Sequence, residues 1–475
     1  MTYVVATAAA MGGFLFGFEI ADISSILIMD NFVKYFNDPS SSSKGLVVSF
    51  LTLGCFLGSV AAGPLADKLS RKRSLIMAGV IMLVGVALET FSVNLGMLTA
   101  ARTIAGLGVG IISAVVPTYQ SELSHPAIRG RLISLQQFAI TFGIMMAFWI
   151  DAAFNTIKKN NFQWRGVFIF QLVVCALFTI IMVTMPYSPR WLMSKGRKED
   201  AIKSLMRLRS ASEANEKIMR EADEIEAEIE RERQTEVASY GTLFGQQFRK
   251  LLLGIILQVL QQLTGINAII YYAGQIVKTT NLTSGDGVFI GAAMVGVVNF
   301  VSTIPAVIYV DKLGRRKLLI FGAIGAALCH FVVVITSLIG GGWDDNGDYG
   351  YTNKSCAWAG LIFLYAFLCF FAVSWGPVCW IYPPEIFSTA MRSKATSITA
   401  ASNWVMNFII GLVVPIIINP LGWGLYLIFG ASMVVAAFLV WAFYPETKGK
   451  TYEQIDAEFK SAILVRNMVS TSVKA

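Results

Sequence analysis

Charged side chains are scarce in this sequence. Asp, Glu, Lys and Arg make up 14% of its 475 residues, whereas 55% are hydrophobic and the mean hydropathy is +0.62. A soluble protein of this length would carry about a quarter charged residues and would divide into several domains. The shortage of charge therefore excludes a soluble protein and predicts an all-α polytopic membrane protein.

Cysteine is also sparse, and the six cysteines are scattered along the chain. Five lie in apolar runs and Cys356 stands alone in a predicted outer loop, so their spacing indicates neither a disulfide framework nor a metal site. A glycine-rich run that opens at Arg102, RTIAGLGVG, follows no strand and does not fit a dinucleotide-binding turn. We therefore expect no metal, no cofactor and no enzymatic activity.

Apolar residues gather in twelve runs that are long enough to cross a bilayer. These runs lie near 3–29, 45–66, 74–93, 97–121, 131–152, 164–186, 251–277, 287–310, 318–340, 357–383, 395–418 and 422–444. The net charge of +8 comes from Lys and Arg, which cluster in the loops after even-numbered runs. The positive-inside rule then places those loops and both termini in the cytoplasm. Because the basic charge follows topology, it predicts no nucleic-acid partner.

One stretch in the middle of the chain, QQLTGINAIIYY at 261–272, places three amides inside an apolar run. A buried amide without a partner costs roughly 2–7 kcal/mol, so Gln261, Gln262 and Asn267 must face protein, water or a ligand. An amide donates and accepts hydrogen bonds at once, which matches the hydroxyl groups of a sugar. The alternative is that these amides only join helices to one another.

A straight helix could not aim all three amides at one ligand. At about 100° per residue, Asn267 falls about 120° away from Gln261. We expect the helix to unwind at Gly265, because glycine tolerates such backbone and because transporters hold substrate at broken helices near the membrane midplane.

Later runs add further amides and indoles. Asn299 lies in the eighth run, Trp380 lies in the tenth run among prolines that predict a bend, and Asn403 and Trp404 are adjacent in the eleventh. An indole on the C–H face of a sugar, beside an amide on its hydroxyls, is typical of carbohydrate recognition. These residues predict a carbohydrate site built by several helices.

Ionisable residues inside the runs are few. Glu19 and Asp22 lie in the first run, where a central charge costs about 2.5–3.5 kcal/mol on insertion scales. When every other Lys and Arg is assigned to a loop, the connector or a tail, Arg102 is left in the membrane and becomes the candidate partner of Glu19. Such a carboxylate is a candidate proton carrier; the alternative is a permanent structural pair.

Motifs on the inner side occur twice in the same order. DKLSRKR at 67–73 returns as DKLGRRK at 311–317, Glu122 with Arg129 returns as Glu385 with Arg392, and PYSPR at 186–190 returns as PETK at 445–448. Two parallel six-helix halves explain this repeat. We expect halves at 1–186 and 250–445, a polar helical linker at 187–249 whose charges face solvent or brace both halves, and a cytoplasmic tail at 446–475.

Charged groups of these motifs are predicted to latch the cytoplasmic side by ion pairs. The candidate gate residues are Asp67, Arg71, Glu122, Arg129, Arg190, Asp311, Arg315, Arg316, Glu385, Arg392 and Glu446.

Taken together, the motifs resemble the sugar porter family of the major facilitator superfamily, and within it they resemble the fungal-type hexose transporters. They are GGFLFGFE at 12–19, the two DKL loops, PTYQSE with RG at 117–130, PYSPRWL at 186–192, QQLTGIN at 261–267, GPVCW at 376–380, SNW at 402–404 and PETKGKT at 445–451. The resemblance implies a major facilitator fold and alternating access. It implies sugar contacts at Gln137, Gln261, Gln262, Asn267, Asn299, Gly376, Trp380, Asn403 and Trp404, with Tyr271 and Tyr272 closing the outer side.

Three positions depart from the family pattern. Proton-coupled members resemble one another in carrying Asp where this chain has Glu19, whereas facilitators often carry Asn. Ser70 replaces a loop glycine at a position that often needs positive φ. Tyr187 stands where the family supplies Glu, so one inner-side ion pair is expected to be missing or rebuilt.

The sequence thus predicts a monosaccharide transporter of the plasma membrane that works as a monomer on a sugar substrate. Proton symport is favoured; facilitated diffusion and a non-transporting sugar sensor are the alternatives, and the short tail disfavours the sensor. The sequons at Asn281 and Asn353 fall on the predicted outer side and predict a glycoprotein.

Overall fold

The structure, a computed structural model, describes residues 1–124, 129–157, 160–235, 240–283, 286–343 and 349–459. Within them, twelve helical segments are long and apolar enough to cross a membrane, which confirms the twelve predicted runs. Large apolar side chains such as Ile180, Ile324 and Phe438 point outward and are exposed. Such a surface suits lipid, because every backbone polar group of a helix is already paired within the helix.

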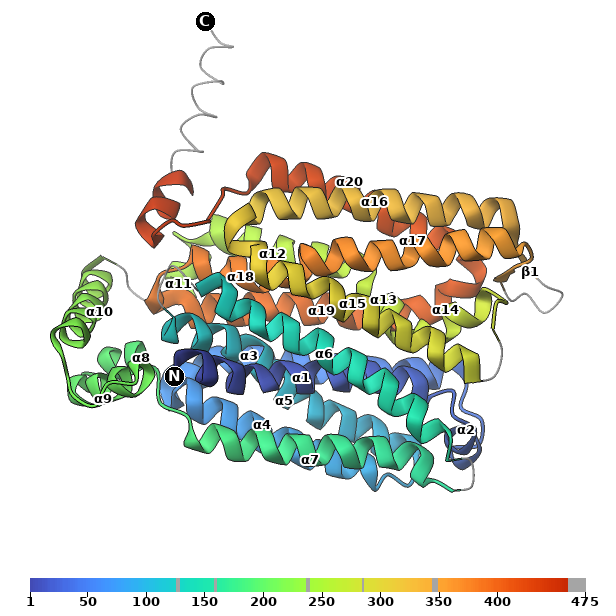
Figure 1. The fold of residues 1–475 in the computed structure, drawn as a ribbon, viewed down its shortest axis with the longest axis horizontal. Coiled ribbons are helices and arrows are strands. Elements are labelled where there is room, and N and C mark those ends of the chain that lie inside the picture. The colour runs from blue at the N-terminus through green and yellow to red at the C-terminus, as the bar shows by residue number, and fades with distance from the viewer. Residues whose placement is uncertain (125–128, 158–159, 236–239, 284–285, 344–348, 460–475) are drawn as a thin grey trace, which may run out of the picture.

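The long helices run side by side along one axis and form two bundles (Figure 1). The N-terminal bundle consists of α1 (Thr2–Ile26), α3 (Ser41–Leu69), α4 (Arg71–Thr90), α5 (Leu95–Leu123), α6 (Arg129–Asn155) and α7 (Phe162–Thr184), with the short α2 (Asp30–Tyr35) after α1. The C-terminal bundle consists of α12 (Phe248–Gln262), α13 (Ile266–Tyr271), α14 (Ala273–Thr279), α15 (Asp286–Leu313), α16 (Arg315–Gly340), α17 (Lys354–Val373), α18 (Trp375–Ile386), α19 (Thr389–Leu421) and α20 (Gly424–Phe443).

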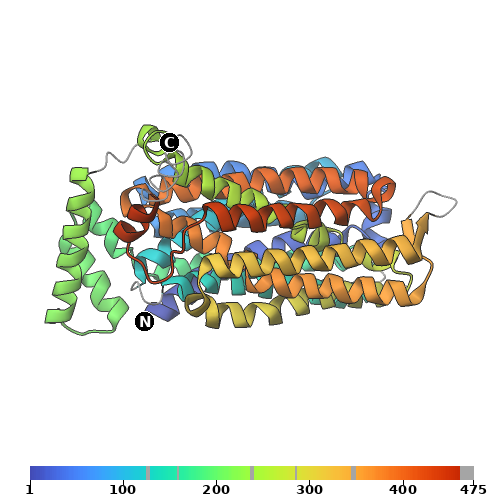
Figure 2. The same cartoon turned by 90° about the horizontal axis from the view of Figure 1, so that it is seen from above.

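The two ends of the molecule differ. At one end lie the N-terminus and the helices between the bundles, which are α8 (Pro189–Ser194), α9 (Lys198–Arg209), α10 (Glu216–Thr235) and α11 (Tyr240–Phe244). At the other end a hairpin of β1 (Gly341–Trp343) and β2 (Tyr349–Tyr351) projects from the C-terminal bundle. We call these the linker end and the hairpin end; Figure 2 shows both from a second side.

The predicted polar linker is helical, but it is not solvated on all sides. Helix α10 buries Ile218, Ala222, Ile225 and Ile229 against α8 and α9, so the three helices share a small apolar core. Its charged residues face outward, as in the pair of Lys198 with Glu226 at 2.6 Å.

Helix α5 packs closely on α3 through the small residues that the sequence singled out. A Cβ atom on Gly106 would lie 2.1 Å from the carbonyl oxygen of Leu51, and one on Gly110 would lie 2.1 Å from that of Cys55. Larger residues would push the helices apart, so these glycines fix the position of α5 and of the Arg102 that it carries.

Two membrane segments are broken in their middle. The predicted unwinding at Gly265 is present: α12 ends at Gln262, Gly265 has φ +89°, and α13 begins at Ile266. The second break lies at Ser374, between α17 and α18. The helix continues through Pro383 and Pro384, so the bend lies before Pro377 rather than at the later prolines.

Candidate functional site

A small cavity lies between the two bundles, close to the break in α12–α13. Its volume is about 50 Å³, which is room for water and not for a sugar. Its wall is formed by Phe16, Ile20, Gln137, Ile140, Ile144, Gln261, Gln262, Ile266, Asn267, Ile270, Asn299, Phe371, Trp380, Asn403 and Asn407. Seven of the eleven residues predicted to contact substrate therefore line one space, and both bundles contribute to it.

Asn403 on α19 is the centre of an amide network in this wall. Its Nδ2 donates to Oε1 of Gln258 at 2.7 Å and to Oε1 of Gln261 at 2.6 Å, and its Oδ1 accepts from Nε2 of Gln262 at 2.9 Å. Gln261 in turn donates to the carbonyl oxygen of Trp375 at 3.0 Å, next to the break in the tenth segment. The amides of this network form hydrogen bonds with one another, so none of them is buried in the membrane without a partner.

The break at Gly265 brings the third amide into this network. Nδ2 of Asn267, on α13, donates to Oε1 of Gln262, on α12, at 2.6 Å. A continuous helix would turn Asn267 away from Gln262 by about 140°. The positive φ of Gly265 is therefore what allows both side chains to face the same cavity.

Other amides in the wall have unused capacity. Oδ1 of Asn299 is buried and has no hydrogen-bond partner within the described residues. Gln137 is the one amide of the lining from the N-terminal bundle, and its Nε2 would lie 3.1 Å from a Cβ atom on Gly376. Gly376 thus leaves space for the Gln137 amide without lining the cavity itself.

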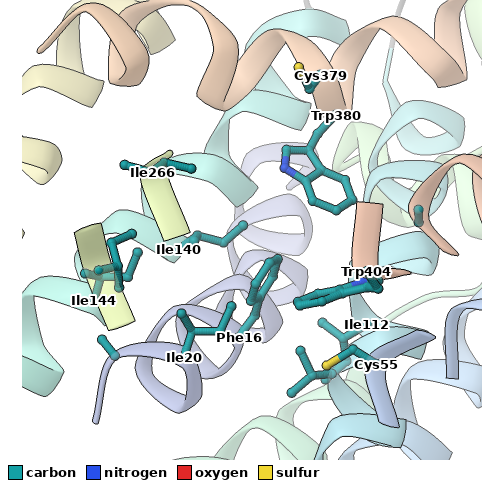
Figure 3. Packing of buried hydrophobic residues seen from close by; sticks show 14 of the residues in the cluster. Phe16, Ile20, Cys55, Ile112, Ile140, Ile144, Ile266, Cys379, Trp380 and Trp404 are labelled. Atoms are coloured by element: carbon teal, nitrogen blue, oxygen red, sulfur yellow. The ribbon is translucent and has the colours of Figure 1, made fainter. Parts of the chain in front are cut away.

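Aromatic rings close the cavity toward the linker end of α1 and α19. The ring of Phe16 meets Trp380 edge-on at 6.1 Å between centroids and lies 5.0 Å from Trp404. Figure 3 shows the Phe16 ring between the two indoles. Trp404 is fully buried and is not among the side chains that line the cavity. Its Nε1 donates to Oγ of Ser113 at 2.9 Å, which ties α19 to α5 across the bundles.

A larger opening of about 690 Å³ lies at the hairpin end. Tyr271 and Tyr272, predicted to close the outer side, line this opening rather than the central cavity. The hydroxyl of Tyr271 donates to Oδ1 of Asn407 at 2.8 Å, and that of Tyr272 donates to the carbonyl oxygen of Gly411 at 2.9 Å. Partial burial raises the pKa of Tyr349 on the hairpin wall, so its hydroxyl stays neutral. The two tyrosines thus separate the opening from the cavity.

The predicted contact between Glu19 and Arg102 is present in the N-terminal bundle. Nη1 of Arg102 lies 2.9 Å from Oε1 of Glu19 and 3.3 Å from Oδ1 of Asp22, and all three side chains are fully buried. Nη2 of Arg102 also donates to the carbonyl oxygen of Glu19 at 3.0 Å, and Gln171 donates to the second carboxylate oxygen of Glu19. The additional methylene of Glu19 therefore does not prevent the pair.

The inner-side motifs form two matching clusters at the linker end, one in each bundle. In the N-terminal cluster, Arg71 lies 2.8 Å from Glu122 and 3.4 Å from Asp67 and donates to the carbonyl oxygen of Ala66. In the C-terminal cluster, Arg315 lies 2.6 Å from Glu385 and 2.9 Å from Asp311 and donates to the carbonyl oxygen of Val310. The repeat in sequence is thus a repeat in structure.

Backbone and capping details repeat as well. Ser70 has φ +96° and Gly314 has φ +92°, so the departure at Ser70 keeps the expected conformation. Tyr187 replaces the missing ion pair with a hydroxyl that accepts from Nε of Arg73 at 3.2 Å and a ring that lies 5.0 Å from Nζ of Lys72.

Most of these contacts stay within one bundle, whereas the expected latch joins the two bundles. Among the described residues, the ion pair that joins the two bundles is that of Asp67 with Lys394 of α19, at 2.9 Å, supported by Ser393 donating to the same carboxylate. The amide nitrogen of Gly63 also donates to Oγ of Ser397 at 3.2 Å. Helices α3 and α19 therefore close the linker end.

The remaining gate candidates lie close to these clusters but have other partners. Arg190 pairs with Glu228 of α10 at 2.9 Å, and Arg392 donates to carbonyl oxygens such as that of Pro384 at 2.9 Å. Glu446 accepts from the backbone nitrogens of Arg315 and Arg316 at 2.8 Å and 3.1 Å. The side chain of Arg129 lies outside the described residues.

Several polar groups at these sites were missed in the sequence. Gln258 precedes the amide motif by one turn, and a helical-face count from Gln261 and Gln262 would have included it. Gln171 and Glu89 lie in otherwise apolar segments, where a search for every polar residue at membrane depth would have found them. Lys394 was assigned to a loop, and nothing in the local pattern indicates that it contacts Asp67.

Two bundles of membrane-length helices around one polar cavity, closed at one end and open at the other, define a membrane transporter of major facilitator architecture. The model of the family described as "Sugar (and other) transporter" matches residues 5–459, and the chain belongs to this family. It is accordingly a transporter and not an enzyme.

Relatives and solved structures agree with this assignment. The chain is 33% identical to the "MFS glucose transporter mfs1" of Aspergillus flavus, covering 97% of this chain and 90% of the relative. It is also 33% identical to a "High-affinity glucose transporter" of Kluyveromyces lactis, covering 96% and 84%. The solved major facilitator "proton:xylose symporter XylE bound to 6-bromo-6-deoxy-D-glucose" is 28% identical with a TM-score of 0.84, covering 96% of this chain and 99% of that one.

Two inward-opened structures of the same relative resemble this chain less closely. Against the partially occluded inward-open structure of XylE from E. coli the TM-score is 0.77, and against the inward-open structure it is 0.71. The values fall as the compared structure opens inward, in keeping with the closed linker end and the opening at the hairpin end.

Proposed function

We propose that this protein transports monosaccharides, hexoses above all, by alternating access through the central cavity. The observation that carries the proposal is the wall itself: neutral amides from both bundles converge on one space, and the wall contains no charged side chain. Neutral groups that both donate and accept suit a polyol, whereas an ionic substrate would call for an opposite charge. The glucose transporters among the relatives support the same substrate class.

Sugar binding would exchange one set of hydrogen bonds for another. The amides of Gln262, Asn267 and Asn403 now bond to one another, and a sugar that enters would take over these donors and acceptors. A net hydrogen bond contributes about 0.5–1.5 kcal/mol, so sugars that differ by one hydroxyl would differ by about this amount. The cavity must widen to admit a ring, since its present volume holds only water.

Alternating access would open the linker end and close the hairpin end. The contacts that must break lie between α3 and α19, including the pair of Asp67 with Lys394. The Arg71 and Arg315 clusters lie within single bundles, so they would move as rigid parts of each bundle. This motion requires the division of the chain proposed from the sequence, with halves at 1–186 and 250–445, the linker at 187–249 and the tail at 446–475.

Proton symport is part of the proposal. Glu19 and Arg102 form a buried pair at 2.9 Å in the N-terminal bundle, away from the sugar cavity wall. Protonation of the Glu19 carboxylate would remove its ion pair with Arg102, which keeps Asp22 as its charged partner, and this couples a proton to the position of α1 against α5. One proton driven by 100 mV contributes about 2.3 kcal/mol, enough for roughly fifty-fold accumulation of sugar. A facilitator would keep this pair closed throughout its cycle.

The orientation follows from charge. Basic residues concentrate at the linker end, as in Arg71, Lys72 and Arg73, so we place that end and both termini in the cytoplasm of a plasma-membrane protein. The hairpin end then faces outward and carries both sequons. Since one chain builds the whole cavity, a monomer suffices for transport.

The experiment uses purified protein in proteoliposomes with labelled glucose. We expect saturable counterflow that unlabelled galactose, mannose, fructose or xylose reduces to different extents. We also expect uphill uptake under an inward proton gradient that an uncoupler abolishes. Sugar binding without counterflow would mean a sensor; counterflow without uphill uptake would mean a facilitator. Absence of both binding and counterflow would overturn the proposal.

A further inference from the structure

His330 of α16 is a fully buried histidine that lies beside the break between α12 and α13. Its ring packs against Phe367 of α17 at 4.4 Å between centroids and against Phe429 of α20 at 5.8 Å. Burial of a polar ring among aromatic side chains costs free energy unless the ring forms a hydrogen bond there. The partner of this hydrogen bond therefore indicates what the histidine does.

One ring nitrogen of His330 contacts the backbone at the break itself. Nε2 lies 2.9 Å from the carbonyl oxygen of Thr264, the residue before Gly265. A carbonyl oxygen can only accept, so Nε2 carries the hydrogen and donates it. Nδ1 has no hydrogen-bond partner within the described residues, which fits a neutral ring with its lone pair on Nδ1. The ring thus supplies one donor, and this donor serves the break.

The carbonyl oxygen of Thr264 needs a donor because the helix is interrupted. In a continuous helix it would accept from the backbone nitrogen of Ala268. Across the break, the backbone nitrogen of Gly265 instead donates to Gln262 and that of Ile269 donates to Gly265, both at 3.1 Å. A carbonyl oxygen without a donor is costly at membrane depth, so a broken helix depends on neighbouring helices to satisfy it. His330 does this from α16.

A second contact supports the break from the same side. A Cβ atom on Gly265 would lie 2.4 Å from the ring of Phe429, which itself packs against His330. Helix α16 also supports the other broken segment, because Nε1 of Trp375, next to the break at Ser374, donates to the carbonyl oxygen of Leu319 at 3.0 Å. Helix α16 therefore contacts the chain at both breaks.

The break determines which amides face the cavity. Asn267 of α13 donates to Gln262 of α12 across the break, and both side chains line the cavity. A continuous helix would turn Asn267 away from Gln262 by about 140°. When only the broken form presents both amides, the fraction of protein in that form sets the apparent affinity for the sugar.

We propose that His330 is a positioning residue for sugar binding, which keeps the α12–α13 segment broken by donating to Thr264 and so keeps Asn267 in the cavity wall. This inference rests on the proposed monosaccharide transport. His330 is not part of the cavity wall and does not touch the sugar. Loss of its donor lowers the fraction of binding-competent protein, and saturating sugar restores that fraction by selecting the competent form. The half-saturating concentration then rises, whereas the maximum rate is kept.

The test measures glucose counterflow in proteoliposomes, as a half-saturating concentration and a maximum rate per folded protein. His330→Phe keeps an aromatic ring and removes the donor. His330→Gln removes the ring and keeps an amide nitrogen as many bonds from Cα as Nε2 is, whereas the amide nitrogen of His330→Asn is one bond nearer and falls short. The three variants therefore separate donation from packing.

We expect His330→Phe and His330→Asn to raise the half-saturating concentration about tenfold at an unchanged maximum rate. Tenfold corresponds to about 1.4 kcal/mol, within the range for a buried acceptor left without a donor. His330→Gln should stay within about twofold of wild type. In an Asn267→Ala background, His330→Phe should change the half-saturating concentration less than about twofold, because the amide that His330 positions is gone.

The outcomes separate this inference from the transport proposal. An unchanged half-saturating concentration in His330→Phe would overturn the inference and leave transport intact, as would a His330→Gln variant that is as impaired as His330→Phe. A lower maximum rate at an unchanged half-saturating concentration would mean a merely structural role and also overturn it. A full tenfold effect in the Asn267→Ala background would overturn it as well. Absence of saturable counterflow by wild type would overturn the transport proposal itself.

A second measurement applies if the variants do not fold. Nitrogen-15 NMR of histidine-labelled protein distinguishes a ring nitrogen that carries hydrogen from one that does not. The sequence contains two histidines, so His125→Gln leaves the signals of His330 alone. We expect a neutral ring with its hydrogen on Nε2. A hydrogen on Nδ1 in the folded protein would overturn the inference.

Discussion

Replacement of Lys394 by glutamine should release the closed linker end in part. Lys394 lies 2.9 Å from Asp67 across the two bundles, and it is the basic partner that joins them among the described residues. The side chains of Lys394 and Asp67 are 19% and 28% exposed, so the pair is worth more than a surface pair and less than a fully buried one. We take the contribution of this ion pair to the closed linker end as about 1 kcal/mol. Its loss then changes the ratio of inward-open to outward-open protein about fivefold.

The assay is a distance measurement between spin labels at Leu69 and Leu313. These exposed residues occupy equivalent positions at the linker ends of α3 and α15, one in each bundle. In a background without native cysteines, Lys394→Gln should raise the population with the longer distance about fivefold. Lys68→Gln is the control, because Lys68 is exposed on the same turn of α3 and has no partner within the described residues.

An unchanged distance distribution in Lys394→Gln would refute the reasoning. It would mean that apolar packing and the Ser397 contacts hold α3 against α19 without help from the ion pair. A shift of the same size in Lys68→Gln would also refute it, because general loss of positive charge would then explain the effect.

Three further predictions test other parts of the structure. Glu19→Gln should lower gradient-driven glucose uptake relative to counterflow at least tenfold, and an unchanged ratio in vesicles would exclude a coupling role. Gly265→Ala should destabilise the protein by roughly 1–3 kcal/mol more than Gly449→Ala in thermal unfolding, since both need positive φ but only the former meets an aromatic ring, at 2.4 Å. Asn353→Gln should remove a glycan seen as a gel shift, whereas Asn281→Gln should not, because the Asn281 amide donates to the backbone of β2.

Much of the fold could be predicted because membrane-spanning helices are recognisable from their long runs of apolar residues. Twelve apolar runs gave twelve helical segments, and the isolated glycine at 265 marked the break. The contact of Glu19 with Arg102 could be predicted by elimination, because few ionisable residues lie at membrane depth and each needs a partner. Such arguments need only local sequence and the cost of burial.

The contacts between bundles could not be predicted, because they depend on how two rigid bundles meet. Asp67 belongs to a motif that indicates a gate, yet its partner Lys394 belongs to no motif. Trp404 is adjacent to Asn403 in sequence, and the turn of α19 points it to Ser113 rather than to the cavity wall. Glu89 lies near the end of its apolar run, where a charge is usually solvated, and yet the packing of the bundle buries it completely.

The mutual bonding of the amides has a consequence for the unloaded carrier. Gln262 forms hydrogen bonds with both Asn403 and Asn267. In the proposed cycle the empty protein would therefore need no water in the cavity to satisfy these amides while it changes conformation. The empty carrier would return easily in this proposed cycle, and net transport of sugar would not require exchange with a sugar molecule from the other side. The amides that we propose as the sugar contacts are thus also the groups that satisfy one another in the empty cavity.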